Sequence, residues 1–188
     1  GTTGAWTLTD DYVYFLDRGL VRGVAALVGP SASLVEFGAG KGCMASALRR
    51  EGVRVRAYDG SPNASKVTRG LVHNADLTRK LKLASADWVL CLEVAEHVPR
   101  RYENVLLANL DRAARKGVIL SWSNSDKGNG HVNARENDWV LNAMRTRGFV
   151  WDEAAQAALR GSVSDIHWYR ESVMVFKRNA MSQLIASE

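Results

Sequence analysis

The chain has 188 residues, of which 46% are hydrophobic and 24% are charged. This length predicts one domain with its own hydrophobic core, and the composition excludes a largely disordered or fibrous protein. Apolar runs extend over only a few residues, whereas a transmembrane helix needs ~20, so no membrane partner is expected.

Charge and cysteine content indicate the environment of the protein. The net charge is +5, with the basic residues scattered in pairs and not gathered in one run, so an anionic partner such as RNA is only a secondary expectation. The two cysteines, Cys43 and Cys91, lie in apolar stretches, and no secretory signal is visible at the start of the chain. Both features favour an intracellular, cytoplasmic protein with buried thiols.

From the N-terminus, apolar residues at helical spacing predict a first helix over residues 9–28, capped by Thr9 or Asp10 and ended by Gly29 and Pro30. Short apolar strands then alternate with helices. The strands are expected at residues 34–37, 53–58, 71–73, 86–92, 117–122, 149–151 and 172–177, and the helices at 41–51, 62–69, 100–114, 134–147 and 152–159. This alternation predicts an α/β fold: a doubly wound, mostly parallel, seven-stranded sheet with helices on both faces and the last strand antiparallel.

A glycine-rich turn follows the first predicted strand. It reads Glu36-Phe37-Gly38-Ala39-Gly40-Lys41-Gly42 and opens the next helix, which in a doubly wound sheet is where a nucleotide-like ligand lies. The spacing does not fit the phosphate loop Gly-x-x-x-x-Gly-Lys-Ser/Thr, so ATP or GTP binding of that kind is disfavoured. The dinucleotide pattern Gly-x-Gly-x-x-Gly fails at its third glycine, and Glu36 suits a cationic ligand better than a pyrophosphate. A nicotinamide-dependent oxidoreductase is therefore the second choice.

An acidic residue ends the second predicted strand. Asp59 lies about 20 positions after Gly38, the separation at which a carboxylate accepts hydrogen bonds from the hydroxyls of a bound ribose. The dipeptide Asp59-Gly60 is also common in turns, so the position relative to the glycine turn, and not the dipeptide, favours the ribose interpretation.

Five segments in this order resemble the motifs of class I S-adenosylmethionine-dependent methyltransferases, over nearly the whole chain. They are the glycine turn at residues 36–42, residues 58–60, residues 74–77, residues 92–99 and residues 117–122. The resemblance implies a Rossmann-like methyltransferase fold, S-adenosylmethionine as the cofactor and methyl transfer as the activity. It also implies one methyltransferase domain over residues 1–178, with residues 1–30 as a helical lid bearing Trp6, Tyr12 and Tyr14. After the last predicted strand, residues 179–188 are expected to form a poorly ordered tail.

The same resemblance implies the cofactor contacts. The glycine turn is expected beneath the methionine part, Asp59 at the ribose, Asp76 and Leu77 at the adenine, and Glu93 with Val94 near the sulfonium. The full set of implied cofactor-binding residues is Glu36, Gly38, Ala39, Gly40, Gly42, Asp59, Gly60, Asp76, Leu77, Glu93 and Val94.

The candidate catalytic residues are His131, His97 and Glu96. His131 lies in a polar, glycine-rich stretch after the fifth strand, and loops at that edge of a sheet commonly carry function. The ordinary pKa of histidine suits a general base, which is needed only where the acceptor loses a proton during attack. Glu93, Glu96 and His97 share a face if their segment is helical. His167, Trp168 and Tyr169 are candidates for the wall of an acceptor pocket.

Two further alternatives concern the chemistry. Glu93, Glu96 and His97 together with His131 also resemble the Mg²⁺ site of small-RNA 2′-O-methyltransferases, which makes a metal-assisted RNA enzyme one alternative. The flanks of His131 differ from that family, so no metal ligands are predicted. Residues 130–133 instead resemble a eukaryotic-type group of methyltransferase domains with a Gly-His-Val-Asn loop. A module that binds the cofactor without catalysis is the remaining alternative, and the methyl acceptor is not identified.

Overall fold

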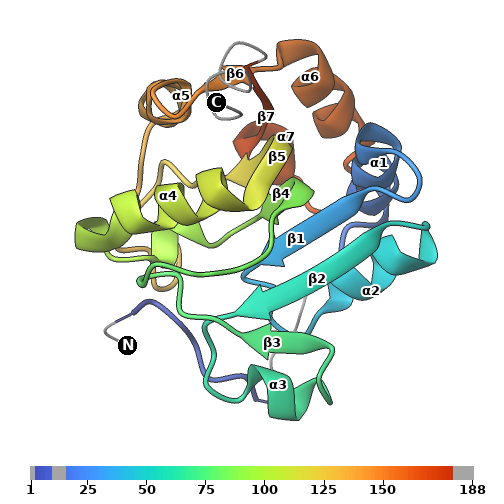
Figure 1. Cartoon of the computed structure of the whole chain (residues 1–188). Helices are drawn as coiled ribbons and strands as arrows, with labels where there is room; N and C mark the ends of the chain where they lie inside the picture. The colour runs from blue at the N-terminus through green and yellow to red at the C-terminus, as the bar shows by residue number, and fades with distance from the viewer. Residues whose placement is uncertain (1–2, 10–15, 180–188) are drawn as a thin grey trace, which may run out of the picture.

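The computed structural model describes residues 3–9 and 16–179, and within them one seven-stranded sheet has the strand order β3-β2-β1-β4-β5-β7-β6 (Figure 1). β7 pairs antiparallel with both β5 and β6, and the other pairings are parallel. The strands are β1 (Ser33–Phe37), β2 (Arg54–Asp59), β3 (Val72–Asn74), β4 (Ala86–Cys91), β5 (Ala114–Ser121), β6 (Phe149–Trp151) and β7 (Val173–Arg178). The predicted mostly parallel sheet with an antiparallel last strand is confirmed.

Helices cover both faces of this sheet. Leu34 of β1 packs into one core and its neighbour Val35 into the other, because successive side chains of a strand point to opposite faces. The first core includes α1 (Arg18–Val28), α2 (Cys43–Arg50) and α6 (Glu153–Ser162), and the second includes α4 (Glu103–Ala113) and α5 (Asn137–Arg145). The short helices are α3 (Ala64–Val67), η1 (Ala95–His97), η2 (Arg100–Tyr102) and α7 (Tyr169–Ser172).

The first helix begins later than the sequence predicts. α1 starts at Arg18, because the side chain of Asp17 accepts the N–H of Leu20 and caps the helix there. The described residues 3–9, 16 and 17 are not helical, so Thr9 does not cap this helix. Asp10, Tyr12, Tyr14 and the tail from residue 180 lie outside the described residues. The other predicted helices and strands are present, with their ends shifted by a few residues.

Asp17 also ties α1 to the segment before α7. Its buried carboxylate accepts the backbone N–H groups of Ser164, Asp165 and Ile166 at 2.7–3.0 Å. Burial acts to raise the pKa of Asp17, but these hydrogen bonds outweigh it and hold the pKa well below its usual range. This contact fixes the position of the segment that carries Ile166, Trp168 and Tyr169.

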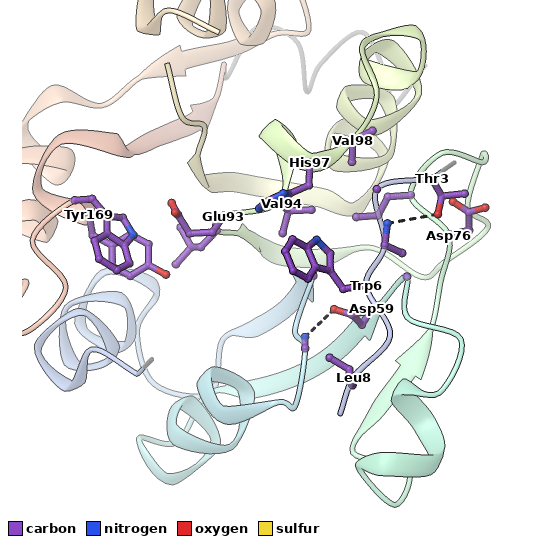
Figure 2. A pocket seen from close by; sticks show the side chains of 18 of the residues that line it. Thr3, Trp6, Leu8, Asp59, Asp76, Glu93, Val94, His97, Val98 and Tyr169 are labelled. Carbon is purple, nitrogen blue, oxygen red and sulfur yellow. Dashed lines mark hydrogen bonds between the residues drawn. The ribbon is translucent and has the colours of Figure 1, made fainter. Parts of the chain in front are cut away.

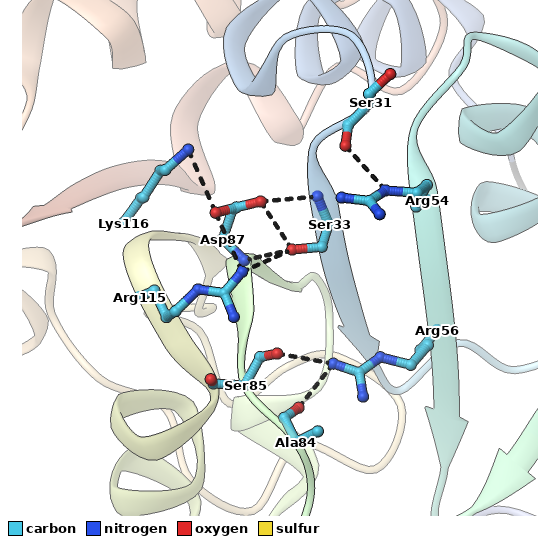
Figure 3. A network of polar contacts seen from close by, with 9 residues as sticks. All are labelled: Ser31, Ser33, Arg54, Arg56, Ala84, Ser85, Asp87, Arg115 and Lys116. Carbon is cyan, nitrogen blue, oxygen red and sulfur yellow. Dashed lines mark hydrogen bonds and ion pairs between the residues drawn. The ribbon is translucent and has the colours of Figure 1, made fainter.

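The edge of the sheet where β1 and β4 begin is held by a charged network (Figure 3). Asp87 accepts hydrogen bonds from the backbone and side chain of Ser33 and forms ion pairs with Arg115 and Lys116 at 3.3 Å. These contacts join the ends of neighbouring strands and lie at the edge opposite the glycine turn.

Candidate functional site

A cavity of about 270 Å³ opens at the edge where β1, β2 and β4 end (Figure 2). Parallel strands leave their carboxyl ends at one edge of the sheet, where doubly wound folds bind ligands. The volume is close to the lower end of the ~300–1,000 Å³ of small-molecule pockets. The wall consists of Thr3, Gly4, Ala5, Trp6, Leu8, Gly38, Gly40, Asp59, Gly60, Asp76, Leu77, Leu92, Glu93, Val94, His97, Val98, Ile166, Trp168 and Tyr169.

The glycine turn and the end of β2 are joined by a hydrogen bond. The backbone N–H of Gly40 donates to Oδ2 of Asp59 at 2.7 Å (Figure 2), and the N–H of Ser61 donates to Oδ1 at 2.7 Å. Gly38 has a φ of +76°, and a Cβ there would come within 2.1 Å of Cγ2 of Val94, so only glycine fits. The turn therefore presents its backbone to the cavity, with the carboxylate of Asp59 already oriented.

The N-terminal segment lies along the cavity wall as a strap, which we define as residues 3–8. The N–H of Leu8 donates to Oδ1 of Asn63 at 3.1 Å, and Nδ2 of Asn63 donates back to the carbonyl of Leu8 at 2.7 Å. Trp6 packs edge-on against His97, with ring centroids 5.7 Å apart. The strap thus covers the cavity without forming a helix in the residues described.

Glu93 occupies a constrained position two residues after the end of β4. Its φ is +54°, which is uncommon for a residue other than glycine. Oγ of Ser121 accepts the N–H of Glu93 at 2.7 Å and donates to Oε1 of its side chain at 2.8 Å. Burial raises the pKa of Glu93, opposed by hydrogen bonds from Ser121 and the side chain of Trp168. Ser121 therefore fixes a carboxyl group on the cavity wall.

The residues predicted at the adenine station lie at another part of the wall. Oδ1 of Asp76 accepts the N–H and the hydroxyl of Thr78 at 2.9 and 2.6 Å, which holds the carboxylate in a turn. Leu77 is buried beside it. Asp59 and Asp76 therefore both face the cavity, one from the end of β2 and one from the segment after β3.

Glu96, His97 and His131 form a second polar group, which we call the Glu–His cluster. Nε2 of His131 lies 4.0 Å from Oε1 of Glu96, and the ring centroids of His97 and His131 are 5.0 Å apart. Burial, and then the neighbouring Glu93, raise the pKa of Glu96 to about 8, whereas burial lowers the pKa of His97. His97 lines the cavity, and Glu96 and His131 lie behind it.

Most of the sequence-predicted site residues meet at this cavity. Gly38, Gly40, Asp59, Gly60, Asp76, Leu77, Glu93, Val94 and His97 line it, as do Trp168 and Tyr169, whereas Glu36, Ala39, Gly42, Glu96, His131 and His167 do not. Glu36 is buried behind the turn, where burial and then the charge of Asp59 raise its pKa to about 8. The segment containing Glu93, Glu96 and His97 is not an α-helix: only Ala95–His97 form a 3₁₀ turn.

Sequence reasoning missed several wall residues and one that positions the wall. Thr3, Gly4, Ala5, Leu8 and Ile166 line the cavity, and Ser121 holds Glu93. No motif marks the strap or Ile166. The position of Ser121 at the end of β5, beside β4, was the one available signal, because neighbouring parallel strands end together.

The sequence was compared with models of known protein families. Residues 12–154 match a family model described as a methyltransferase domain. The chain belongs to this family. The match confirms the predicted methyltransferase family and favours it over the oxidoreductase alternative. No curated protein matches the methyltransferase chain by sequence.

The methyltransferase chain also has the fold of solved methyltransferases. Magnesium protoporphyrin IX methyltransferase from Synechocystis PCC 6803, solved with S-adenosylhomocysteine, shares 16% identity at a TM-score of 0.66, covering 91% of this chain and 90% of its own. A TehB-like S-adenosylmethionine-dependent methyltransferase from Corynebacterium glutamicum shares 16% at 0.63, covering 90% of each. The N-methyltransferase NodS from Bradyrhizobium japonicum, also with S-adenosylhomocysteine, shares 16% at 0.61, covering 86% and 84%. The predicted Rossmann-like methyltransferase fold is confirmed.

One further observation concerns membranes. Among the residues described, no helix is long and apolar enough to cross a bilayer.

Proposed function

We propose that this methyltransferase domain transfers a methyl group from S-adenosylmethionine to an acceptor whose reactive atom approaches on the side of His97. The observation that carries the proposal is the hydrogen bond between Gly40 and Asp59, which places a carboxylate beside a glycine backbone in the wall of one cavity. A nucleoside with a charged tail needs such a pairing of ribose acceptor and close backbone approach.

Each wall segment has a role in this proposal. The backbone at Gly38 and Gly40 lies beneath the methionine part, and Asp59 accepts hydrogen bonds from the ribose hydroxyls. Asp76 and Leu77 contact the adenine, and Glu93 with Val94 lies beside the sulfonium. Glu36, Ala39 and Gly42 act from behind the turn, where Glu36 accepts the N–H of Ala45 at the start of α2. The strap closes over the bound cofactor and, with α1, makes up the proposed lid of a single domain.

The chemistry of this site is in-line displacement. The acceptor atom attacks the methyl carbon, the carbon–sulfur bond breaks, and the cofactor leaves as neutral S-adenosylhomocysteine. Because the cofactor carries the activation, the protein mainly aligns acceptor and methyl group and excludes water, which can supply up to ~7–11 kcal/mol. Trp6 and Tyr169 provide apolar surface for that purpose.

The Glu–His cluster stands on the proposed acceptor side. His97 reaches the cavity wall, and His131 and Glu96 support it from behind. Where the acceptor has a proton to lose, we assign its removal to this cluster.

Calorimetric titration of the purified protein with S-adenosylhomocysteine tests the proposed cofactor. Saturable binding at one site, with no binding of NADH, is expected. The reverse pattern contradicts the proposal and returns the oxidoreductase alternative. Release of S-adenosylhomocysteine from S-adenosylmethionine in the presence of candidate acceptors separates an enzyme from a module that only binds.

The RNA alternative has its own signature. The basic residues of the chain are not gathered in one run, so the net charge of +5 is weak support for a nucleic-acid partner. Several of them pair with carboxylates, namely Arg79, Arg115, Lys116, Arg135, Lys177 and Arg178. RNA binding that weakens steeply as salt rises would support RNA as the acceptor, because phosphate contacts release counterions.

A further inference from the structure

The three side chains of the Glu–His cluster converge closely enough to share one ion. Each offers one ligand atom, and these atoms all lie within 4.8 Å of one another, with Nε2 of His131 and Oε1 of Glu96 at 4.0 Å. Two ligands of a tetrahedral ion, each ~2.1 Å from it, are ~3.4 Å apart. A contraction of about 0.6 Å for the pair of His131 and Glu96, and of at most about 1.4 Å for the widest pair, therefore brings the cluster to ligand distances.

Backbone carbonyl groups set the protonation of both histidine rings. Nδ1 of His97 lies 3.1 Å from the carbonyl oxygen of Gly130, and Nδ1 of His131 lies 2.6 Å from that of Ser125. A carbonyl oxygen only accepts hydrogen bonds, so each Nδ1 carries the proton and each Nε2 of the neutral ring presents a lone pair. Histidines that bind metals are held in this way, with the second ring nitrogen donating to a carbonyl or carboxylate.

Glu96 completes the set with a negative charge. Its side chain is 0% exposed, and neither carboxylate oxygen has a hydrogen-bond partner. Buried polar groups are nearly always partnered, and leaving one unpaired is destabilising, more so when it is charged. A cation among Glu96 and the two lone pairs satisfies all three groups at once.

The main chain brings the ligands together from two segments. Glu96 and His97 lie on η1 after β4, and His131 lies in the loop after β5. The N–H groups of Val132 and Asn133 both donate to the carbonyl of Glu96, at 2.9 and 3.0 Å. The residues that follow His131 in sequence thus hold it against Glu96. The cluster is therefore positioned by backbone hydrogen bonds and not by side-chain contacts alone.

We propose that Glu96, His97 and His131 bind one divalent first-row transition-metal ion, such as Mn²⁺, Fe²⁺, Co²⁺ or Zn²⁺. The sequence around His131 predicted no metal ligands, whereas the arrangement of the three side chains favours a metal site. Two imidazoles and one carboxylate suit these ions better than Mg²⁺ or Ca²⁺, which prefer oxygen ligands. Three protein ligands leave coordination positions open, and His97 belongs to both the cluster and the cavity wall.

A role for this ion toward an acceptor rests on the proposed function. With the ion bound, the two Nε2 atoms are ligands and no longer proton acceptors. An acceptor with a hydroxyl or carboxyl oxygen would then occupy an open position, and the ion, in place of a histidine, would favour its deprotonated form. The metal site itself stands on the side-chain geometry alone.

The test is titration of the chelator-treated, tag-free protein with Co²⁺, followed by visible absorption and calorimetry. Wild type is expected to bind one Co²⁺ per chain with visible d–d bands. His131→Ala and Glu96→Gln are expected to lose affinity by at least ~10-fold, since even outer contacts of metal ligands change affinity 10- to 100-fold. His73→Ala, which removes an exposed histidine on β3, is the matched control and is expected to bind as wild type does.

The outcomes are distinct. Absence of Co²⁺ binding by wild type overturns the site without requiring any variant to fold. Equal loss of affinity in a folded His73→Ala and a folded His131→Ala also overturns it. Retained binding by a folded Glu96→Gln and a folded His131→Ala also overturns it. Binding of S-adenosylhomocysteine is measured on the same samples. Unchanged affinity for it in His131→Ala separates failure of the metal site from failure of the proposed function.

Discussion

The carboxylate of Asp59 offers the sharpest test of the proposed cofactor site. Its two oxygens each accept one backbone N–H, from Gly40 and Ser61, both at 2.7 Å. A carboxylate has about four lone-pair positions, so two remain for the ribose hydroxyls. We expect Asp59→Ala to weaken binding of S-adenosylhomocysteine, because these two charged hydrogen bonds are lost and the glycine turn loses its anchor.

The size of the effect follows from the kind of bond. Hydrogen bonds to a charged group contribute ~1.5–3 kcal/mol, and every ~1.4 kcal/mol is a factor of ten in affinity. The dissociation constant is therefore expected to rise about 10- to 150-fold. Asp59→Asn should fall between wild type and Asp59→Ala, since its carboxamide keeps one acceptor oxygen but its amino group cannot accept from Gly40 or Ser61.

The assay is isothermal titration with S-adenosylhomocysteine, beside denaturant unfolding of each variant. Asp87→Asn is the matched control, because Asp87 also accepts a backbone N–H but lies at the opposite edge of the sheet. It should lose stability while its affinity for the ligand stays unchanged. If Asp59→Ala bound S-adenosylhomocysteine within twofold of wild type, Asp59 would not bind the ribose, and its hydrogen bond to Gly40 would not indicate a cofactor site.

Three further predictions concern stability and the strap. Asp17→Ala should lower the free energy of unfolding by about 3 kcal/mol or more, the scale of several hydrogen bonds to a charged group. Because the pKa of Asp17 is depressed in the folded state, this difference in urea denaturation should be full above pH ~4 and shrink on acidification. The pKa of Glu36 is raised to about 8 in the folded state. Wild type therefore loses free energy of unfolding as pH rises from ~4.5 towards 8, because Glu36 ionises in the unfolded chain before it does so in the folded one. Glu36→Gln should therefore gain stability over wild type across that range, and equal melting shifts at pH 5 and pH 8 would contradict the assignment. Trp6→Ala, which removes an edge-on contact with His97 worth ~0.5–1.5 kcal/mol, should speed dissociation of S-adenosylhomocysteine in stopped-flow measurements, and an unchanged rate would remove the strap from the lid.

The sequence alone was sufficient to predict the sheet and many of the residues that line the cavity. Alternation of short apolar strands with helices leaves few ways to bury both faces, and the glycines of the turn and Asp59 lie at strand ends whose position the topology dictates. Patterns of this kind depend only on residues that are near one another in sequence. Five such motifs in the order typical of the family therefore predicted the methyltransferase fold without knowledge of any tertiary contact.

Tertiary structure decided what local patterns do not encode. Asp17, not Thr9, caps α1, because residues 164–166, distant in sequence, turn their N–H groups toward it. His131 lies against Glu96 because the chain after β5 donates two N–H groups to η1. The strap reaches the cavity through Asn63. Each of these contacts joins segments far apart along the chain, and only the packed sheet, which brings the ends of its strands to one edge, sets which of them meet.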